Sequence, residues 1–396
     1  MKNKYNYKFP LVEKLARESE ENLAHIDRQK LSVSEDFVEW KGGSLKMKIK
    51  ESGFIQKLCY LLRIDYIIHA FSASYKNDVQ KALKTYLSEE ELNDKKLVTR
   101  IKKDMRSCDK LIMAKPYEYF FLNLRNKTKQ ERVNFITDKY MLQRMSICGN
   151  RRTHDIELNE KYNFYLLAKP FFKRVVLLLN RKTSFEAFEK EALIQKKMIF
   201  KPSFLGCGGG IFVADVSTSE KARKVFDKVV SYGGNWVAEE LIVQAEDMAN
   251  WNMSSVNTIR LLSFSTDEGI KFTTSFIRTG RDGAVVDNGG AGGIFAAIDE
   301  DSGKIITDGF DEFAHLYVCH PNSNIKYKGW QVPYWEELKE TAIAVHSTVF
   351  PDMKYIGWDF ALTEKGWVLI EGNWGQFLQQ APLGFGLRNV FDNYVK

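Results

Sequence analysis

The stretch YIGWDFALTEKGWVLIEGNWGQ, residues 355–376, places charged side chains inside what otherwise reads as a buried hairpin. Apolar and aromatic residues flank the turn at 363–366 and predict two paired strands. Asp359 stands within the first strand, and Glu371 and Asn373 end the second. Burying unpaired carboxylates is strongly unfavourable, so this hairpin needs something that offsets their charge.

Strand alternation places Trp358, Phe360 and Leu362 on one face and Asp359 on the other. Glu371 and Asn373 share a face because they are two residues apart. If the two strands pair across the turn, the three oxygen-bearing side chains Asp359, Glu371 and Asn373 converge. Such a set of hard oxygen ligands suits Mg²⁺. The alternative is a solvated strand face, which the surrounding tryptophans disfavour.

The length of 396 residues indicates two or three domains, or one elaborated domain. With 44% hydrophobic and 28% charged residues, the composition indicates a soluble globular protein. No apolar run approaches about 18 residues, so no transmembrane segment is expected. The first residues turn charged without an apolar core of about 7–15 residues, so we expect no secretory signal. The five cysteines are odd in number and form no CxxC pair, which fits a cytoplasmic location.

The formal charge of +7 is a modest and diffuse excess. It is compatible with an anionic ligand or an anionic membrane surface, but it is too diffuse to indicate nucleic acid. No zinc-finger or RNA-binding pattern appears, and we expect no nucleic-acid partner.

The secondary-structure pattern divides the chain near residue 130. Residues 1–130 are predicted to be mostly helical, including a buried apolar helix at 53–73. Residues 131–396 mix helices and strands in an order that indicates an α+β architecture and not a βαβ repeat. The strands predicted in this part are 175–180, 198–204, 210–216, 236–243, 257–265, 270–280, 291–299 and the two arms of the hairpin.

The segment KPSFLGCGGG, residues 201–210, combines a lysine at a strand end with a glycine-rich loop. Glycines allow backbone N–H groups to approach an anion closely, and Lys201 adds a cation. The glycines concerned are Gly206, Gly208, Gly209 and Gly210. The segment is not a Walker A loop, which needs Gly-Lys-Ser/Thr before a helix. A phosphate-binding loop and a hairpin turn without ligand both remain open.

A second candidate segment is WVAEELIVQAEDM, residues 236–248, where charged residues follow a strand. Backbone groups near Leu241 and Ile242 are suited to reading an adenine, with Glu239 on its amino group and Glu246 on ribose hydroxyls. The alternative is a set of solvated glutamates at a strand end.

Three further polar residues lie on or beside the later strands. Arg260 and Arg278 are placed to direct guanidinium groups at phosphate or acyl phosphate, or else to form ordinary ion pairs. Asn288 lies in the glycine-rich segment VVDNGGAGGI, which is either a mobile substrate loop or a long connection.

Taken in order, these motifs resemble the ATP-grasp superfamily, and most closely the sugar-transfer-associated ATP-grasp family, over roughly residues 110–390. TDKYMLQRM, residues 137–145, is similar to the first lysine motif of the family, which implies that Lys139 faces the nucleotide. The resemblance implies nucleotide-binding roles for Lys201, the loop glycines, Glu239, Leu241, Ile242 and Glu246. It implies catalytic roles for Arg260, Arg278 and Asn288, and metal binding by Asp359, Glu371 and Asn373.

The resemblance further implies an ATP-grasp fold, in which two α+β subdomains clamp ATP and residues 184–245 cover the nucleotide. The cofactors would be ATP and Mg²⁺, with Mn²⁺ as a substitute. The expected activity is that of a ligase that forms a carbon–nitrogen bond between a small-molecule carboxylate and an amine through an acyl phosphate. The family points to modification of a cell-surface polysaccharide or its precursor. An ATP-dependent phosphotransferase and a non-catalytic nucleotide-binding protein are the alternatives.

Overall fold

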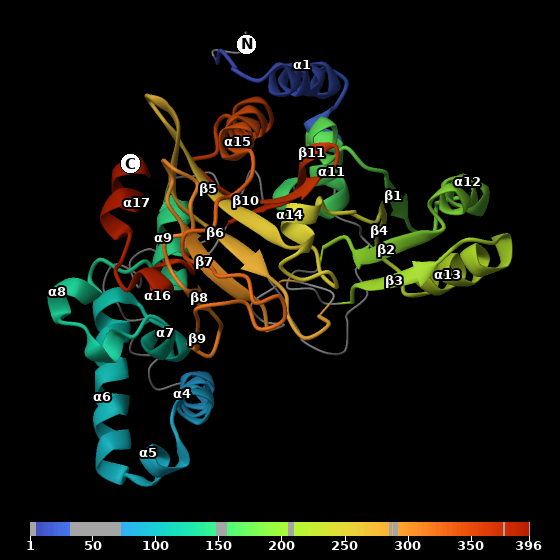
Figure 1. Ribbon diagram of the computed structural model, residues 1–396. Helices are drawn as coiled ribbons and strands as arrows, with labels where there is room; N and C mark the ends of the chain where they lie inside the picture. Colours follow the sequence, from blue (N-terminus) through green and yellow to red (C-terminus); the bar gives the residue numbers. More distant parts are fainter. Residues whose placement is uncertain are drawn as a thin grey trace.

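The computed structural model of the protein describes residues 5–31, 73–147, 157–204, 210–284, 287, 292–374 and 377–395. These residues form two antiparallel sheets with helices packed around them, and the predicted α+β class is confirmed (Figure 1). The predicted helix at 53–73 lies outside the described residues, as do Gly206, Gly208, Gly209 and Asn288.

A seven-stranded sheet forms the centre of the molecule (Figure 1). Its strands follow the order β11-β10-β5-β6-β7-β8-β9, and every neighbouring pair is antiparallel. The bounds are β5 Thr258–Thr266, β6 Gly269–Thr279, β7 Ile294–Ile298, β8 Gly309–Phe310, β9 Leu316–Tyr317, β10 Tyr355–Thr363 and β11 Gly366–Asn373.

The predicted hairpin is confirmed, because β10 and β11 pair and Thr363 lies opposite Gly366 across the turn. Asp359 lies opposite Glu371 in this register, and the register shifts between Asp359 and Phe360. Trp358 and Phe360 are fully buried in the main core. The strand alternation therefore separates an apolar face from the face that carries Asp359.

Helices cover both faces of the central sheet. The face that carries Trp358 packs against α1 (Pro10–Ala24), α11 (Lys161–Phe172) and α15 (Trp335–Val349), whose apolar residues share one core. Apolar residues of α9 (Asp138–Ile147) and α17 (Arg388–Tyr394) form another cluster with Leu262, Phe264 and Tyr355 of the sheet. A short helix, α16 (Gln380–Leu383), contacts β7 and β8.

A smaller sheet lies beside the central one and carries its own core (Figure 1). Its order is β1-β4-β2-β3, and α12 and α13 pack against it. The bounds are β1 Val176–Leu179, β2 Lys197–Pro202, β3 Phe212–Asp215, β4 Trp236–Glu240, α12 Phe185–Gln195 and α13 Ser219–Ser231. Ser184 caps α12 by accepting a hydrogen bond from the Ala187 amide at 3.2 Å, as its position before the helix predicts.

The N-terminal helices divide into two groups. Helix α1 belongs to the main core, and its Ser19 hydroxyl lies 3.0 Å from that of Thr348 on α15. The helices from α4 onward form a separate helical lobe, whose core reaches Phe295 and Phe310 of the central sheet (Figure 1). The lobe comprises α4 Ala73–Tyr86, α5 Glu89–Asn93, α6 Lys95–Ile112, α7 Pro116–Phe121, the 3₁₀ helix η2 Leu124–Asn126 and α8 Lys129–Arg132; a second 3₁₀ helix, η1, spans Arg28–Lys30.

Within the described ranges, no helix combines the length and the apolar composition that crossing a membrane requires.

Candidate active site

The centre of the site is a buried ion pair between two neighbouring strands. Asp359 on β10 lies opposite Arg260 on β5, and the arginine donates to the carboxylate from Nε and, at 2.6 Å, from Nη2. Arg278 on β6 donates to the same carboxylate at 3.1 Å. Burial alone would raise the pKa of Asp359, but the two guanidinium groups outweigh it and lower the pKa. Asp359 therefore stays ionised although it is only 2% exposed.

Glu371 and Asn373 complete the set of three oxygen-bearing side chains predicted from the hairpin. The Asn373 Oδ1 atom accepts a hydrogen bond from Arg260 at 3.1 Å, and its amide nitrogen lies 3.4 Å from Glu371 Oε1. Burial raises the pKa of Glu371, and the adjacent Asp359 carboxylate raises it further. Glu371 lies opposite Asp359 in the strand register, and the three side chains lie close together as expected.

Asp287 is a further acidic residue of this cluster, and it was not predicted. It accepts a hydrogen bond from Arg278 Nη2 at 2.7 Å and another from the hydroxyl of Thr258. Burial raises its pKa, although Arg278 and Thr258 act in the opposite direction. The sequence signal that could have identified Asp287 is its position immediately before Asn288, in the glycine-rich segment VVDNGGAGGI.

Lys201 and Glu239 lie on neighbouring strands of the smaller sheet and form an ion pair at 2.9 Å. Arg174 contacts the other Glu239 oxygen from Nε at 3.1 Å and from Nη2 at 2.9 Å, and it donates to the Leu369 carbonyl of β11 at 2.6 Å. Burial opposes ionisation of Glu239, but Lys201 and Arg174 outweigh it and lower the pKa of Glu239 to about 2. Arg174 therefore links the smaller sheet to the hairpin that carries Glu371.

Lys161, the first residue of α11, is a second lysine of the site that the sequence reasoning missed. Its ammonium donates to the Pro202 carbonyl at 3.2 Å, and its amide donates to the Ser203 carbonyl at 2.8 Å. Burial lowers the pKa of Lys161, while the charges of Glu371 and Glu239 act in the opposite direction. These interactions place Lys161 between the two sheets, beside the end of β2.

The remaining residues predicted to bind the nucleotide lie in different parts of the structure. Gly210 has φ +74°, and a Cβ atom there would lie 2.9 Å from Pro202 Cγ, so this position requires glycine. Leu241 and Ile242 follow β4 and are half-buried, and Glu246 is exposed at the start of α14 (Glu246–Ala249). Lys139 lies on α9, where its ammonium pairs with Asp109 of α6 at 3.4 Å.

The chemistry of the donor set decides which metal the site suits. Two carboxylates and one amide supply oxygen atoms only, which is what Mg²⁺ prefers. Among the described parts of the chain, no group of three His, Cys, Asp or Glu side chains is arranged to hold a metal ion. The candidate set contains only two side chains of these types, because its third member is Asn373. Burial and the adjacent Asp359 both raise the pKa of Glu371, so a cation bound here would relieve the repulsion between the two carboxylates.

The comparisons with known proteins identify the family of this chain. The profile of the family described as sugar-transfer associated ATP-grasp matches residues 192–395, which is more than half of the chain. The chain belongs to this family of ATP-grasp proteins. No curated protein matches it.

The chain also shows similarity to solved structures. One is D-alanyl-alanine synthetase A from Vibrio cholerae O1 biovar eltor str. N16961, with 12% identity, a TM-score of 0.39 and coverage of 63% of this chain and 66% of that one. The D-alanine-D-alanine ligase from Coxiella burnetii shows 11% identity, a TM-score of 0.39 and coverage of 64% of both chains. The corresponding ligase from Helicobacter pylori shows 19% identity, a TM-score of 0.37 and coverage of 61% of both. This chain spans less than two thirds of each of them.

Proposed function

We propose that this protein is an ATP- and Mg²⁺-dependent ligase that joins a carboxylate to an amine through an acyl phosphate. The observation that carries the proposal is the meeting of Asp359, Glu371 and Asn373 with Arg260 and Arg278 at one buried point of the central sheet. Oxygen ligands for a divalent cation and guanidinium groups for phosphate are the two requirements of phosphoryl transfer.

The nucleotide is held between the two sheets in this proposal. Lys201 and Lys161 supply positive charge for the phosphates at the end of β2, and Lys161 takes the role that the resemblance implied for Lys139. The proposal assigns the phosphates to the glycine-rich segment that follows Lys201, whose backbone N–H groups suit an anion. The adenine contacts the chain near Leu241 and Ile242, where β4 has ended, and Glu246 binds the ribose.

Asp359, Glu371 and Asn373 hold the metal in this proposal. Mg²⁺ supplies stabilisation of the charge on the phosphate oxygens. Ionised Glu371 is the form that would bind a cation, and burial together with the adjacent Asp359 opposes that form. Arg260 keeps Asp359 and Asn373 at a fixed separation because it donates to both side chains.

The reaction proposed for this site has two steps. An oxygen of the substrate carboxylate attacks the γ-phosphorus of ATP, the bond to the β-phosphate oxygen breaks, and ADP leaves. The amine nitrogen then attacks the acyl carbon, the bond to phosphate breaks, and the nitrogen loses one proton. The first step needs no general base, because a carboxylate is ionised at neutral pH. Arg260 and Arg278 stabilise the negative charge that is transferred, with Asn288 as a further proposed catalytic residue.

The family description supports a setting in carbohydrate metabolism. We therefore propose that one of the two substrates belongs to a cell-surface polysaccharide or its precursor. The reaction takes place in the cytoplasm in this proposal, where ATP is supplied.

Phosphate release measured over a matrix of acids and amines tests the proposal. The panel includes uronic acids, amino acids and amino sugars, with Glu371→Gln as the inactive control. The proposal expects release of ADP and phosphate only when an acid and an amine are both present. ATP consumption that yields a stable phosphorylated product would identify a phosphotransferase. Tight ATP binding without turnover on any pair would identify a non-catalytic nucleotide-binding protein.

A further inference from the structure

Helix α6 of the helical lobe carries a line of cations on its exposed side. Lys96, Arg100, Lys103 and Lys110 are exposed and recur at intervals of three, four or seven residues, with exposed Ser107 in the gap. On a helix these positions fall within an arc of roughly 80°. The opposite side of α6 is apolar and buried, with the members Ile101, Met105, Cys108 and Ile112. The cations therefore form a stripe that faces solvent, interrupted at Ser107.

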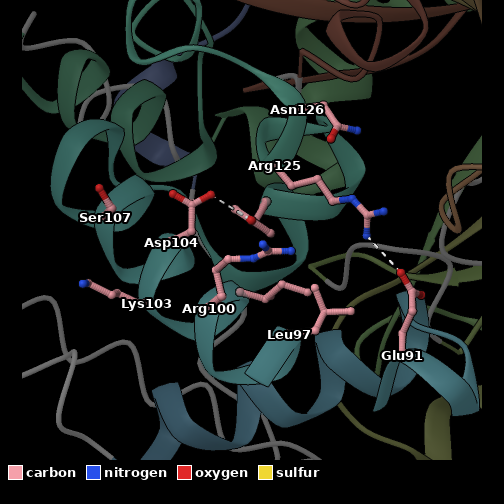
Figure 2. A pocket seen from close by; sticks show the side chains of 10 residues that line it. Glu91, Leu97, Arg100, Lys103, Asp104, Ser107, Arg125 and Asn126 are labelled. Atoms are coloured by element: carbon pink, nitrogen blue, oxygen red, sulfur yellow. Dashed lines mark hydrogen bonds and ion pairs between the residues drawn. The ribbon is translucent and has the colours of Figure 1, made fainter. Parts of the chain in front are cut away.

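A cavity of 580 Å³ adjoins this stripe, between α6 and the segment that contains η2. Figure 2 shows Arg100 of α6 and Arg125 of η2 reaching toward this hollow from different segments, with Asn126 beside Arg125. Lys103 and Ser107 line it from α6 as well. The hollow thus brings together cations from two parts of the lobe.

The acidic residues at the cavity do not cancel these cations. Asp104 accepts two hydrogen bonds from Arg132, at 2.7 and 2.8 Å, and that arginine already balances its charge. Glu91 lies 3.6 Å from Arg125 in a partly exposed pair, which contributes little. Arg100 and Lys103 have neither a hydrogen bond nor an ion pair to any side chain in the described part of the lobe. Both are free to bind an anion.

The surroundings of the stripe indicate the chemistry of that anion. Residues 73–132 contribute none of the large apolar side chains that are exposed in the described structure. The lobe therefore has no apolar wedge for a bilayer and no exposed aromatic ring on which a nucleobase could stack. Ser107 and Asn126 instead place neutral hydrogen-bonding groups among the cations, which suits a ligand that carries hydroxyl groups.

We propose that α6 and the adjoining cavity bind an acidic polysaccharide, at a site separate from the ATP clamp. From Lys96 to Lys110 the stripe extends over roughly 21 Å, which matches a linear polyanion better than one small anion. Clusters of Lys and Arg bind acidic polysaccharides as well as nucleic acids. The inference depends only on the surface of the helical lobe and not on the reaction proposed above.

The test is binding of fluorescently labelled polygalacturonate oligomers to the full chain, followed by anisotropy over a series of salt concentrations. The variant replaces Arg100, Arg125 and Lys103 together by glutamine. The matched control replaces exposed Lys14, Lys304 and Lys328 by glutamine, which changes the net charge equally. We expect the Kd to rise about tenfold or more in the variant and to change less than about twofold in the control, with affinity falling as salt rises.

Two results would overturn the inference. One is an equal loss of affinity in both triple variants, which would mean that net charge alone drives binding. The other is tighter binding of double-stranded DNA, or of vesicles containing phosphatidylserine, than of polygalacturonate at the same ionic strength. Binding of a non-hydrolysable ATP analogue is measured in parallel and is expected to be unchanged in both variants, so this test is independent of the ligase proposal.

Discussion

Arg260 and Asp359 lie opposite each other on β5 and β10, and the guanidinium group donates to both carboxylate oxygens. The same guanidinium group reaches Asn373 on β11. A single arginine thus fixes two of the three proposed metal ligands before any metal binds. Such preorganisation lowers the cost of assembling a charged site and explains how Asp359 can be buried in an apolar hairpin.

Glu371→Gln is expected to lower Mg²⁺-dependent turnover about a hundredfold or more, because the amide supplies no negative charge to the metal. The fold should remain, since Gln has nearly the volume of Glu and carries no charge that burial would penalise. Turnover and the thermal midpoint are measured on the same preparations. Wild-type turnover in Glu371→Gln would reject the metal site.

Lys161→Ala is expected to raise the Kd of an ATP analogue about tenfold, since Lys161 lies beside Lys201 and Glu371. Lys139→Ala serves as the matched control and is expected to change this Kd less than about twofold. Its ammonium pairs instead with Asp109 of the helical lobe. Isothermal titration measures both. A larger rise in Kd for Lys139→Ala than for Lys161→Ala would assign nucleotide binding to Lys139 instead.

Arg174→Met is expected to lower the free energy of unfolding by about 3 kcal/mol, because it removes one of the two cations that balance buried Glu239. It also leaves the Leu369 carbonyl without the guanidinium that links the two sheets. Exposed Arg181→Met is the control and should change stability by less than about 0.5 kcal/mol. Denaturant unfolding compares them, and equal stability of the two variants would show that Arg174 does not hold the sheets together.

Glu300→Gln is expected to change stability in a pH-dependent way. Burial raises the pKa of Glu300 to about 8, although Ser275 and Lys339 act in the opposite direction. A carboxyl group with a raised pKa in the folded state loses stability as pH rises from its unfolded pKa of about 4.5 to about 8. The variant lacks this loss. Its thermal midpoint should therefore rise relative to that of the wild type as the pH increases from 5 to 8. A constant difference across this range would mean that Glu300 ionises normally.

The hairpin could be predicted because its determinants are local. The turn at Thr363–Gly366 and the alternation around Asp359 fix both the pairing and the face of each side chain. The convergence of Glu371 and Asn373 with Asp359 follows from that register. Arg260 was assigned to the site, but its pairing with Asp359 depends on the order of β5 and β10 in the sheet, which no local pattern specifies.

Lys161 and Arg174 could not be found from the sequence because their partners are distant along the chain. Lys161 gains its place when the first turn of α11 hydrogen-bonds to Pro202 and Ser203. Arg174 meets Leu369 only after the smaller sheet packs beside the hairpin. The division of the N-terminal helices has a similar cause, since α1 packs on α15, more than 300 residues later in the chain.

A crystal structure with Mn²⁺ and a non-hydrolysable ATP analogue, in which anomalous scattering locates the metal, tests the proposed metal site most directly. We expect a manganese peak within about 2.0–2.4 Å of oxygen atoms of Asp359, Glu371 and Asn373, with the triphosphate extending from it toward Lys201 and Lys161. A metal bound away from these three side chains, or a nucleotide lodged outside the space between the two sheets, would contradict it.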